Sequence, residues 1–419
     1  MQRNRCWILF YFLVLVVISS CSSSSDGKPS AGAYAFPSPT PFQLNVQASP
    51  SLLPTSDSQK VATFTPNPMA GPDNRSDATP ASVLPLGEAT PSIAIDPLTG
   101  LPPSASNLLQ HRPFASTVTN FPPDVRPQAG LTLADVVFEY YEEPFYTRFM
   151  AVFYGNTTNM VGPVRSGRYF NEHIVRMYHA FFAFQGADPR ELAYFMSGDL
   201  RQFLVRQGSG SCPPYFYSKR NIVSYDNLYF DITKWNDCTA QLHLDNSPQN
   251  IRSTLFDPTP PASNAGAIRI FTTYSIDDYN YWQYDPVSGR YLRYEETNNT
   301  RDNKPANYAP LMDYLNGKQV ATDNVVVLFV PHVFMNEDEQ DDSIFHINLI
   351  DSGSAFVFRN GLAIPGYWMR TDIDQPLLMM NLDGSPIYMK PGQTFFEVIG
   401  ETSTHRTDGT NWYFEYQTP

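Results

Sequence analysis

Hydrophobic and polar positions divide this 419-residue chain into three stretches of different character. An apolar run extends from Cys6 to Ile18, and residues 22–91 behind it are rich in Pro, Ser and Thr. From Asp96 onward, short runs of β-branched and aromatic residues alternate with turn residues, which is typical of strands. The pattern therefore predicts that the folded part of the chain begins near residue 96.

Strands and helices are both predicted between residues 96 and 256. Ala134–Tyr141 and Thr147–Tyr154 are β-branched and aromatic runs separated by Glu-Glu-Pro, which predicts a hairpin or two neighbouring strands. Apolar residues recur near helical spacing over Asn171–Phe184 and Pro189–Arg206, and the second of these segments begins with proline. We therefore expect an α/β or α+β N-terminal domain.

A β-rich C-terminal domain, meander or barrel-like, is predicted over residues 267–419, behind a short Pro-rich linker at 257–266. Asn360-Gly361 and Asp383-Gly384 predict tight hairpin turns, because both central residues must tolerate a positive φ. The strands expected in this domain are Ala267–Thr273, Tyr279–Tyr284, Arg290–Tyr294, Val325–Val330, Ile344–Ile350, Ala355–Arg359, Phe395–Ile399 and Trp412–Tyr416.

Residues 1–20 have the layout of a secretory signal peptide: a basic start, an apolar run too short for a comfortable membrane span, and small residues before a break. The run ends in Ile18-Ser19-Ser20-Cys21, which resembles the bacterial lipobox. We therefore expect cleavage before Cys21 and acylation of its thiol, which anchors a protein to the bilayer without spanning it. The alternative is an ordinary signal peptide in which the cysteine occurs by chance.

Residues 21–95 are expected to form a disordered stalk. The stretch is rich in proline, and fragments such as Pro37–Pro41 (PSPTP) favour extended polyproline II over helices or sheet ladders. Such a composition lacks the apolar residues needed for a core. The stalk would hold the folded part away from the membrane.

Composition excludes two classes of protein. Aromatic residues make up 14% of the chain, which is ample core material and rules out a wholly disordered protein. The net charge is −13, from 28 basic and 41 acidic residues. A nucleic-acid partner is not expected, because such proteins gain affinity by neutralising phosphates with basic residues.

Two cysteines, Cys212 and Cys238, remain in the predicted folded part, 26 positions apart. A disulfide is the simplest arrangement in an oxidising compartment, and two buried free thiols are the alternative. The chain has no CxxC or HExxH motif, so no metal site and no cofactor are predicted. The acidic run 337–342 lacks the spacing of a calcium loop, and we interpret it as a solvated loop.

Charged residues are concentrated in the two predicted N-terminal strands and the loop behind them. Asp135 and Glu139 are four positions apart, so on a strand they face the same side. Arg148 lies at the start of the next strand, and Arg165 and Arg168 follow a Gly-Pro turn. These guanidinium groups predict a binding site for an anion. The alternative is that the arginines pair with Asp135, Glu139 or Glu172 of the same chain and tie the loop to the sheet.

Short motifs occur in a fixed order over residues 96–400. They are Asp96–Pro102 (DPLTGLP), Arg126–Leu131 (RPQAGL), Ala134–Glu139 (ADVVFE), Thr147–Phe153 (TRFMAVF), Gly162–Arg168 (GPVRSGR), Tyr291–Arg293 (YLR), Asp323–Val327 (DNVVV), Gly353–Ala355 (GSA), Arg359–Gly361 (RNG) and Lys390–Thr394 (KPGQT). In their order and number they resemble the YerB family of bacterial lipoproteins, a family of unknown function. The resemblance implies N- and C-terminal YerB-like domains and brings no activity.

The chain also departs from the family pattern at two places. Family members typically carry a His followed by Gly-Gly-Ser-Pro, where this chain has Phe184–Pro189 (FQGADP). The usual Pro-His-Asn-Leu-Tyr is similar to Ser224–Tyr229 (SYDNLY), again without the histidine. Any chemistry that these histidines perform in relatives is not expected here.

The chain also resembles LytR-CpsA-Psr enzymes in the order of three features: a strand that begins with an aspartate, then a hairpin, then a Pro-x-Arg loop. These enzymes move glycopolymers from polyprenyl pyrophosphate to the cell wall. That similarity implies that Arg148, Arg165 and Arg168 hold a pyrophosphate while Asp135 supports a divalent cation. It gives the alternative function, a cell-envelope phosphotransferase-like enzyme acting on a polyprenyl-pyrophosphate-linked glycopolymer.

The main expectation is an extracytoplasmic lipoprotein, anchored to the bacterial cell membrane through acylated Cys21. Its folded part is expected to bind a component of the cell envelope, with an anionic ligand at Arg148, Arg165 and Arg168. Asp135 and Glu139 complete the predicted binding residues, and the sequence leaves open whether the protein is an enzyme.

Overall fold

The computed structural model describes residues 94–142, 145–208, 211–222, 226–251, 254–335 and 344–417. The predicted signal peptide, Cys21, nearly all of the predicted stalk and the acidic run 337–342 lie outside the described residues.

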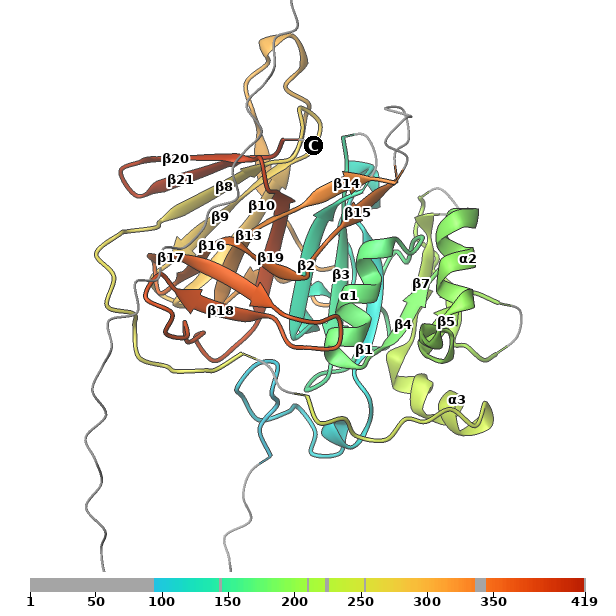
Figure 1. Cartoon of the computed structure of the whole chain (residues 1–419). Helices are drawn as coiled ribbons and strands as arrows, with labels where there is room; N and C mark the ends of the chain where they lie inside the picture. The colour runs from blue at the N-terminus through green and yellow to red at the C-terminus, as the bar shows by residue number, and fades with distance from the viewer. Residues whose placement is uncertain are drawn as a thin grey trace, which may run out of the picture. The chain divides into compact units, whose positions relative to one another are not determined.

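A ten-stranded sheet runs through the described part of the chain (Figure 1). Its strands, in spatial order, are β18 (Leu378–Asn381), β17 (Leu362–Arg370), β16 (Asp351–Arg359), β13 (Asn324–Val330), β19 (Thr394–Gly400), β2 (Val136–Tyr141), β3 (Thr147–Phe153), β1 (Phe114–Thr119), β4 (Phe181–Phe184) and β5 (Leu204–Arg206).

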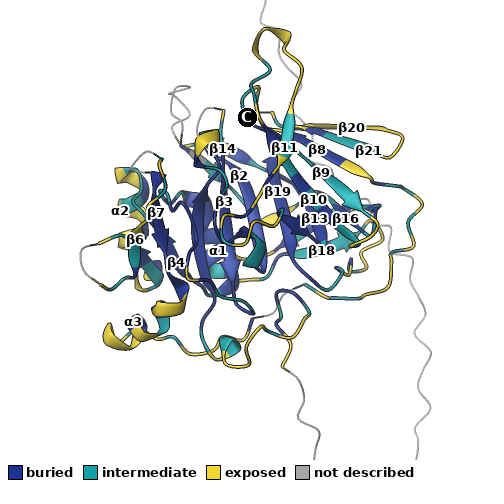
Figure 2. Ribbon diagram, turned by 180° about the vertical axis from the view of Figure 1, so that it is seen from behind, coloured by how far each residue is buried: buried dark blue, intermediate teal, exposed yellow. Residues whose placement is uncertain are grey.

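Strands from both predicted regions meet in this sheet. The predicted hairpin strands β2 and β3 pair antiparallel, which confirms that expectation. On its other edge β2 pairs in parallel with β19, which lies about 250 positions later in the chain. Every residue of β2, β3, β13 and β19 is buried (Figure 2), as expected for strands covered on both faces.

A second sheet contains seven strands, all from the C-terminal region. They are β11 (Tyr308–Pro310), β10 (Arg290–Glu296), β9 (Tyr279–Asp285), β8 (Arg269–Thr273), β21 (Asn411–Glu415) and β20 (Thr404–Asp408), with β12 (Ala321–Thr322) beside β10. Two small pairs complete the strands: β6 (Tyr215–Tyr217) with β7 (Leu228–Phe230), and β14 (His332–Phe334) with β15 (Phe345–Ile347).

The C-terminal region is rich in strands, as predicted, but it is not a separate meander or barrel. Its strands are divided between the two sheets. The physical reason is the sequence of β13 and β19 (NVVVLFV and TFFEVIG), whose apolar residues point to both faces and therefore need cover on both sides.

The two faces of the large sheet are covered differently. On one face the second sheet packs against it, with the Trp282 and Phe395 rings 4.8 Å apart. On the other face lies α1 (Tyr169–Tyr178), whose Phe170 ring is 4.8 Å from that of Tyr140 (Figure 1). This layering gives the mixed α and β structure expected of the N-terminal region.

The two predicted helices are shorter than expected. α1 ends at Tyr178, because His179 adopts a left-handed conformation (φ 50°), and the prediction that this helix continues to Phe184 was wrong. The aromatic residues that follow form β4 instead, buried beside β1. α2 (Pro189–Ser197) ends before Gly198, so the predicted helix over Pro189–Arg206 was also too long.

The remaining helical elements that the structure describes are short. They are α3 (Trp235–Gln241) and the 3₁₀ turns η1 (Leu108–Gln110), η2 (Pro123–Val125), η3 (Leu131–Leu133), η4 (Asp199–Phe203), η6 (Ile232–Lys234) and η7 (Arg301–Asn303).

The predicted linker at residues 257–266 contains no helix or strand, and the C-terminal region holds it in place. The Arg359 guanidinium donates to the carbonyls of Asp257 and Thr259 at 2.7 and 2.6 Å. Ser263 donates to the Ala363 carbonyl at 2.6 Å. The segment therefore follows the edge of the large sheet, and the domain boundary predicted there stays a prediction.

The Asn360-Gly361 turn joins β16 to β17 as a two-residue hairpin, with Arg359 opposite Leu362. Both turn residues have a positive φ, 56° and 73°, as this turn requires. A Cβ atom at Gly361 would lie 2.8 Å from the Tyr284 ring of the second sheet. Glycine is therefore required twice here, by the turn and by the approach of the two sheets.

Replacing Gly361 by alanine should cost more stability than the same change at Gly384. Gly384 also has a positive φ, but a Cβ atom there would meet only the Tyr367 hydroxyl, at 3.9 Å. We expect a loss of about 1 kcal/mol for Gly384→Ala from backbone strain and about 2–4 kcal/mol for Gly361→Ala, measured by urea unfolding. Equal losses would show that the Tyr284 contact does not constrain the turn.

Candidate functional site

The three predicted arginines lie together in an arginine cluster, defined by Arg148, Arg165 and Arg168. Arg148 is on β3, and its Nη2 lies 2.5 Å from the Glu142 carboxylate. Arg168 pairs with the same carboxylate, and its Nη1 lies 3.5 Å from Glu191. One glutamate thus holds two guanidinium groups beside the start of α1.

Arg165 is paired as well, with its Nη1 3.3 Å from the Asp226 carboxylate. Burial raises the pKa of Glu191 to about 7, and the charge of Arg168 opposes that rise. Three arginines therefore face three carboxylates of the same chain. Their positive charge is balanced locally, which ties the loop before α1 to the sheet.

Asp135 lies just before β2 and is held by the backbone at the end of β3. Its Oδ2 accepts from the N–H groups of Tyr154 and Gly155 at 2.5 and 2.9 Å, and its Oδ1 accepts from the Asn156 amide at 2.7 Å. Burial, together with the nearby charge of Asp96, raises the pKa of Asp135 to about 7. Near neutral pH the Asp135 carboxyl is therefore partly protonated.

Glu139 lies between the two sheets. It is the direct partner of Glu397 in the parallel pair β2–β19, and both side chains are fully buried. Like charges side by side on one face destabilise a sheet. Arg293 of β10 lies against both: its Nη2 pairs with Glu139, its Nη1 pairs with Glu397, and its Nε lies 2.7 Å from Glu295.

Further charged groups extend this set into a buried charge cluster, with five carboxyl groups and two arginines. Burial raises the pKa of Glu296 to about 9, that of Asp278 to about 6 and that of Glu139 well above its usual range. Some of these carboxyl groups are therefore protonated at neutral pH. The cluster comprises Arg126, Glu139, Asp278, Arg293, Glu295, Glu296 and Glu397.

The structure does not bring the predicted binding residues to one place. In the β2–β3 ladder Glu139 is opposite Phe149, and Arg148 is opposite Tyr140, so Glu139 and Arg148 face opposite sides of the sheet. The arginine cluster lies on the side of α1, Glu139 lies between the sheets, and Asp135 is bonded to the end of β3.

A pocket of about 250 Å³, which we name the Trp235 pocket, opens elsewhere on the described part of the chain. Trp235 is buried, and its indole N–H has no hydrogen-bond partner among the described residues. Its lining includes two kinds of side chain besides His111 and Arg112: aromatic ones (Phe114, Phe153, Tyr154 and Trp235) and uncharged amides and hydroxyls (Asn107, Asn156, Thr157, Thr233 and Asn236).

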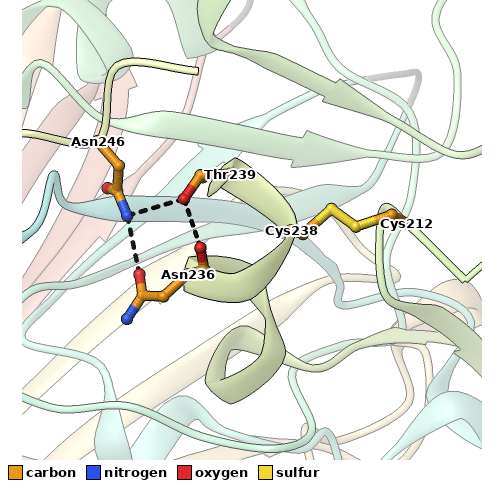
Figure 3. Close-up of a disulfide and its surroundings, with 5 residues drawn as sticks. All are labelled: Cys212, Asn236, Cys238, Thr239 and Asn246. Atoms are coloured by element: carbon orange, nitrogen blue, oxygen red, sulfur yellow. Dashed lines mark hydrogen bonds between the residues drawn. A yellow bond between two sulfur atoms is a disulfide. The ribbon is translucent and has the colours of Figure 1, made fainter. Parts of the chain in front are cut away.

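Hydrogen bonds and a disulfide hold the α3 wall of this pocket (Figure 3). The Asn246 amide donates to Asn236 at 2.9 Å and to Thr239 at 3.2 Å. Cys238 on α3 is bonded to Cys212, which lies before β6. These links fix α3 to segments on both sides of it in the chain, so the pocket wall is preorganised.

Sequence reasoning missed Arg293 and the Trp235 pocket. Arg293 lies on β10 (RYLRYEE) on the same face as Tyr291 and Glu295, and a basic residue at an inward position was a usable signal for a buried ion pair. The pocket carried no such signal, because its lining residues come from η1, β1, β3, η6 and α3. Only the tertiary fold brings these segments together.

Two features are absent from the described residues. No group of three or more His, Cys, Asp or Glu side chains is arranged there to hold a metal ion. No helix among these residues has the length and hydropathy of a membrane span.

Comparison with known proteins places the chain in a family. The model described as "Protein of unknown function (DUF3048) N-terminal domain" matches residues 98–245, and the C-terminal domain model of the same family matches residues 270–396. The chain therefore belongs to the DUF3048 family.

Two matches to a protein of Bacillus subtilis agree with this. The chain is 26% identical over 314 residues to "Putative lipoprotein YerB" of Bacillus subtilis (strain 168), covering 72% of this chain and 85% of the relative. The crystal structure of the YerB protein from Bacillus subtilis superposes with a TM-score of 0.58 at 22% identity, covering 73% of this chain and 96% of that chain. The second match shows the fold, and together they confirm the YerB-like resemblance seen in the motifs.

The buried charge cluster predicts how stability depends on pH. The pKa of Glu296 in the folded chain is about 9, above its value in the unfolded chain, so the folded state binds more protons between pH 7 and 9. The free energy of unfolding should therefore fall as pH rises through this window, by up to about 1.4 kcal/mol per pH unit for each proton.

Glu296→Gln should flatten this dependence, because glutamine resembles the protonated carboxyl and does not titrate. Urea unfolding at pH 7, 8 and 9 checks it, with Glu415→Gln on exposed β21 as the control. A free energy of unfolding that is constant or rises over this range in the unmodified chain would contradict the account.

Proposed function

We propose that this chain is an extracytoplasmic lipoprotein, anchored to the bacterial membrane through acylated Cys21, whose folded part binds a saccharide of the cell envelope. The lipobox-like Ile18–Cys21 and the name of the Bacillus subtilis relative support the anchor. The observation that carries the binding proposal is the Trp235 pocket, whose lining combines aromatic groups with amides and hydroxyls.

This lining suits a sugar. Aromatic faces pack against the C–H groups of a sugar ring, while amide and hydroxyl groups exchange hydrogen bonds with its hydroxyl and acetamido substituents. The unpartnered indole N–H of Trp235 offers one more donor. A volume below about 300 Å³ suits a small ligand or one unit of a longer chain.

Arg112 also lines the pocket, but its guanidinium is engaged elsewhere. It donates to the His179 carbonyl at 2.9 Å and the Asp245 carbonyl at 3.1 Å, and it pairs with the Asp245 carboxylate at 3.2 Å. The proposal is therefore for an uncharged part of the saccharide in this pocket.

The state of the arginine cluster supports binding over phosphoryl transfer. A pyrophosphate site needs guanidinium groups free to meet the ligand. Here Glu142, Glu191 and Asp226 already pair with Arg148, Arg165 and Arg168. The anionic ligand predicted for these arginines stays a prediction, and so does the phosphotransferase-like alternative.

The test is titration of the full chain, purified from membranes in detergent, with N-acetylated chito-oligosaccharide. Mass analysis of its N-terminus first measures whether Cys21 carries lipid. We expect saturable binding with a change in tryptophan fluorescence. Asn107→Ala, at an exposed lining residue, and Trp235→Phe, which removes the indole N–H but keeps an aromatic ring, should each weaken binding about tenfold.

Asn221→Ala, at an exposed asparagine outside this pocket, is the matched control and should leave affinity unchanged. No saturable binding, or equal affinity in all variants, would overturn the saccharide proposal. In a second titration with a polyprenyl pyrophosphate we expect no saturable binding. Binding that Arg165→Ala abolishes would instead support the predicted anion site.

A further inference from the structure

A second pocket, separate from the Trp235 pocket, lies beside the buried charge cluster. We name it the Arg126 pocket, and its volume is about 380 Å³. It is formed where η2 and the segment behind it meet the end of β10 and strand β11. Its walls are apolar and rich in proline: Pro123, Pro127, Ala309, Pro310, Leu311 and Met312.

The polar end of this pocket consists of Arg126, Glu295 and Glu296. Arg126 Nη2 lies 2.8 Å from Glu296 Oε1 and 3.9 Å from Glu295 Oε2. The Glu296 side chain is only 1% exposed, and its Oε2 has no hydrogen-bond partner among the described residues. A buried, unpaired carboxyl oxygen is costly, so this atom needs a proton or a donor from a ligand.

The charge around this atom is negative in excess. The charged and titratable groups that act on Glu296 are Arg126, Glu295, Asp278, Tyr279 and Tyr308. Arg126 is the one cation in this set and faces three carboxyl groups. Arg293 also pairs with Glu295, but it is shared with Glu139 and Glu397, so the whole cluster still has five carboxyl groups for two arginines.

We propose that the Arg126 pocket binds a small organic cation, with its apolar body against the proline-rich walls and its protonated amine at the Glu296 carboxylate. An anion is disfavoured by the excess of carboxyl groups. A bare metal ion is disfavoured too, because beyond the two glutamates the side chains of the lining offer it only the Thr297 hydroxyl oxygen. The proposal is independent of the saccharide proposed for the Trp235 pocket.

Binding of this kind releases a proton. Burial raises the pKa of Glu296 to about 9, so the empty pocket holds a protonated carboxyl at neutral pH. When the ammonium group enters, the carboxyl gives its proton to solvent and becomes the carboxylate that pairs with the amine. The ammonium keeps its own protons, so charge and atoms balance with one proton released.

The experiment is isothermal titration calorimetry of the full chain in detergent with n-pentylammonium, at pH 7.5 in phosphate and in Tris. The difference in heat between the two buffers measures the protons released. We expect saturable binding with release approaching one proton, and at least tenfold weaker binding of 1-pentanol and pentanoate, which share the apolar body.

Two variants probe the two parts of the site. Glu296→Gln removes the carboxylate and should weaken binding at least tenfold and abolish proton release. Ala309→Leu fills the apolar part without changing charge and should weaken binding similarly, which keeps the test valid if one variant folds poorly. Glu415→Gln, on exposed β21, is the matched control and should bind as the unmodified chain does.

Three results would each overturn the proposal. Equal affinity for pentylammonium and pentanol would show an apolar pocket without charge recognition. Preference for pentanoate would assign the pocket to Arg126 as an anion site. Unchanged affinity in Glu296→Gln would place the amine elsewhere. None of these results bears on the Trp235 pocket.

Discussion

Glu139 and Glu397 are neighbours in the same parallel pair of strands, fully buried and on the same face. Without a cation between them, two such carboxyl groups would have to be protonated or the strands would separate. Arg293 reaches them from the second sheet and pairs with both. The join between β2 and β19, and the contact of the two sheets, therefore depend on one guanidinium group.

This arrangement explains why two regions far apart in sequence form one structure. Glu139 lies within the N-terminal match of the family, Arg293 lies within the C-terminal match, and Glu397 is the residue directly after the end of that match. The ring contacts around Arg293, with the centroids of Trp282 and Phe395 5.0 Å from its guanidinium carbon, exclude water from the ion pairs. Low local dielectric strengthens the pairs and makes an unmatched charge there more costly.

Sequence reasoning went furthest where the pattern is local. The β2–β3 pair follows from two β-branched and aromatic runs, and the Asn360-Gly361 turn follows from residues that tolerate a positive φ. Sequence reasoning failed at the end of α1, where Phe182 continues the helical spacing of the residues before it, but burial beside β1 makes Phe181–Phe184 a strand. Tertiary contacts decide such short apolar runs.

The candidate sites could be predicted only in part for the same reason. Asp135, Glu139 and the arginine cluster were found because charge within apolar strands is visible in the sequence. The partners with which these residues form ion pairs were not found, because Arg293, Asp226 and Glu191 come from other elements. The two pockets depend on segments distant in sequence, so neither follows from a motif.

The most direct test of the central claim is the stability of Arg293→Met in urea at pH 7, beside Arg269→Met, which removes an exposed arginine. The account predicts a loss of about 3–5 kcal/mol for Arg293→Met, little change for Arg269→Met, and partial recovery when Glu139→Gln and Glu397→Gln are added to Arg293→Met. Equal, small losses at both arginines, or no recovery in the triple variant, would contradict it.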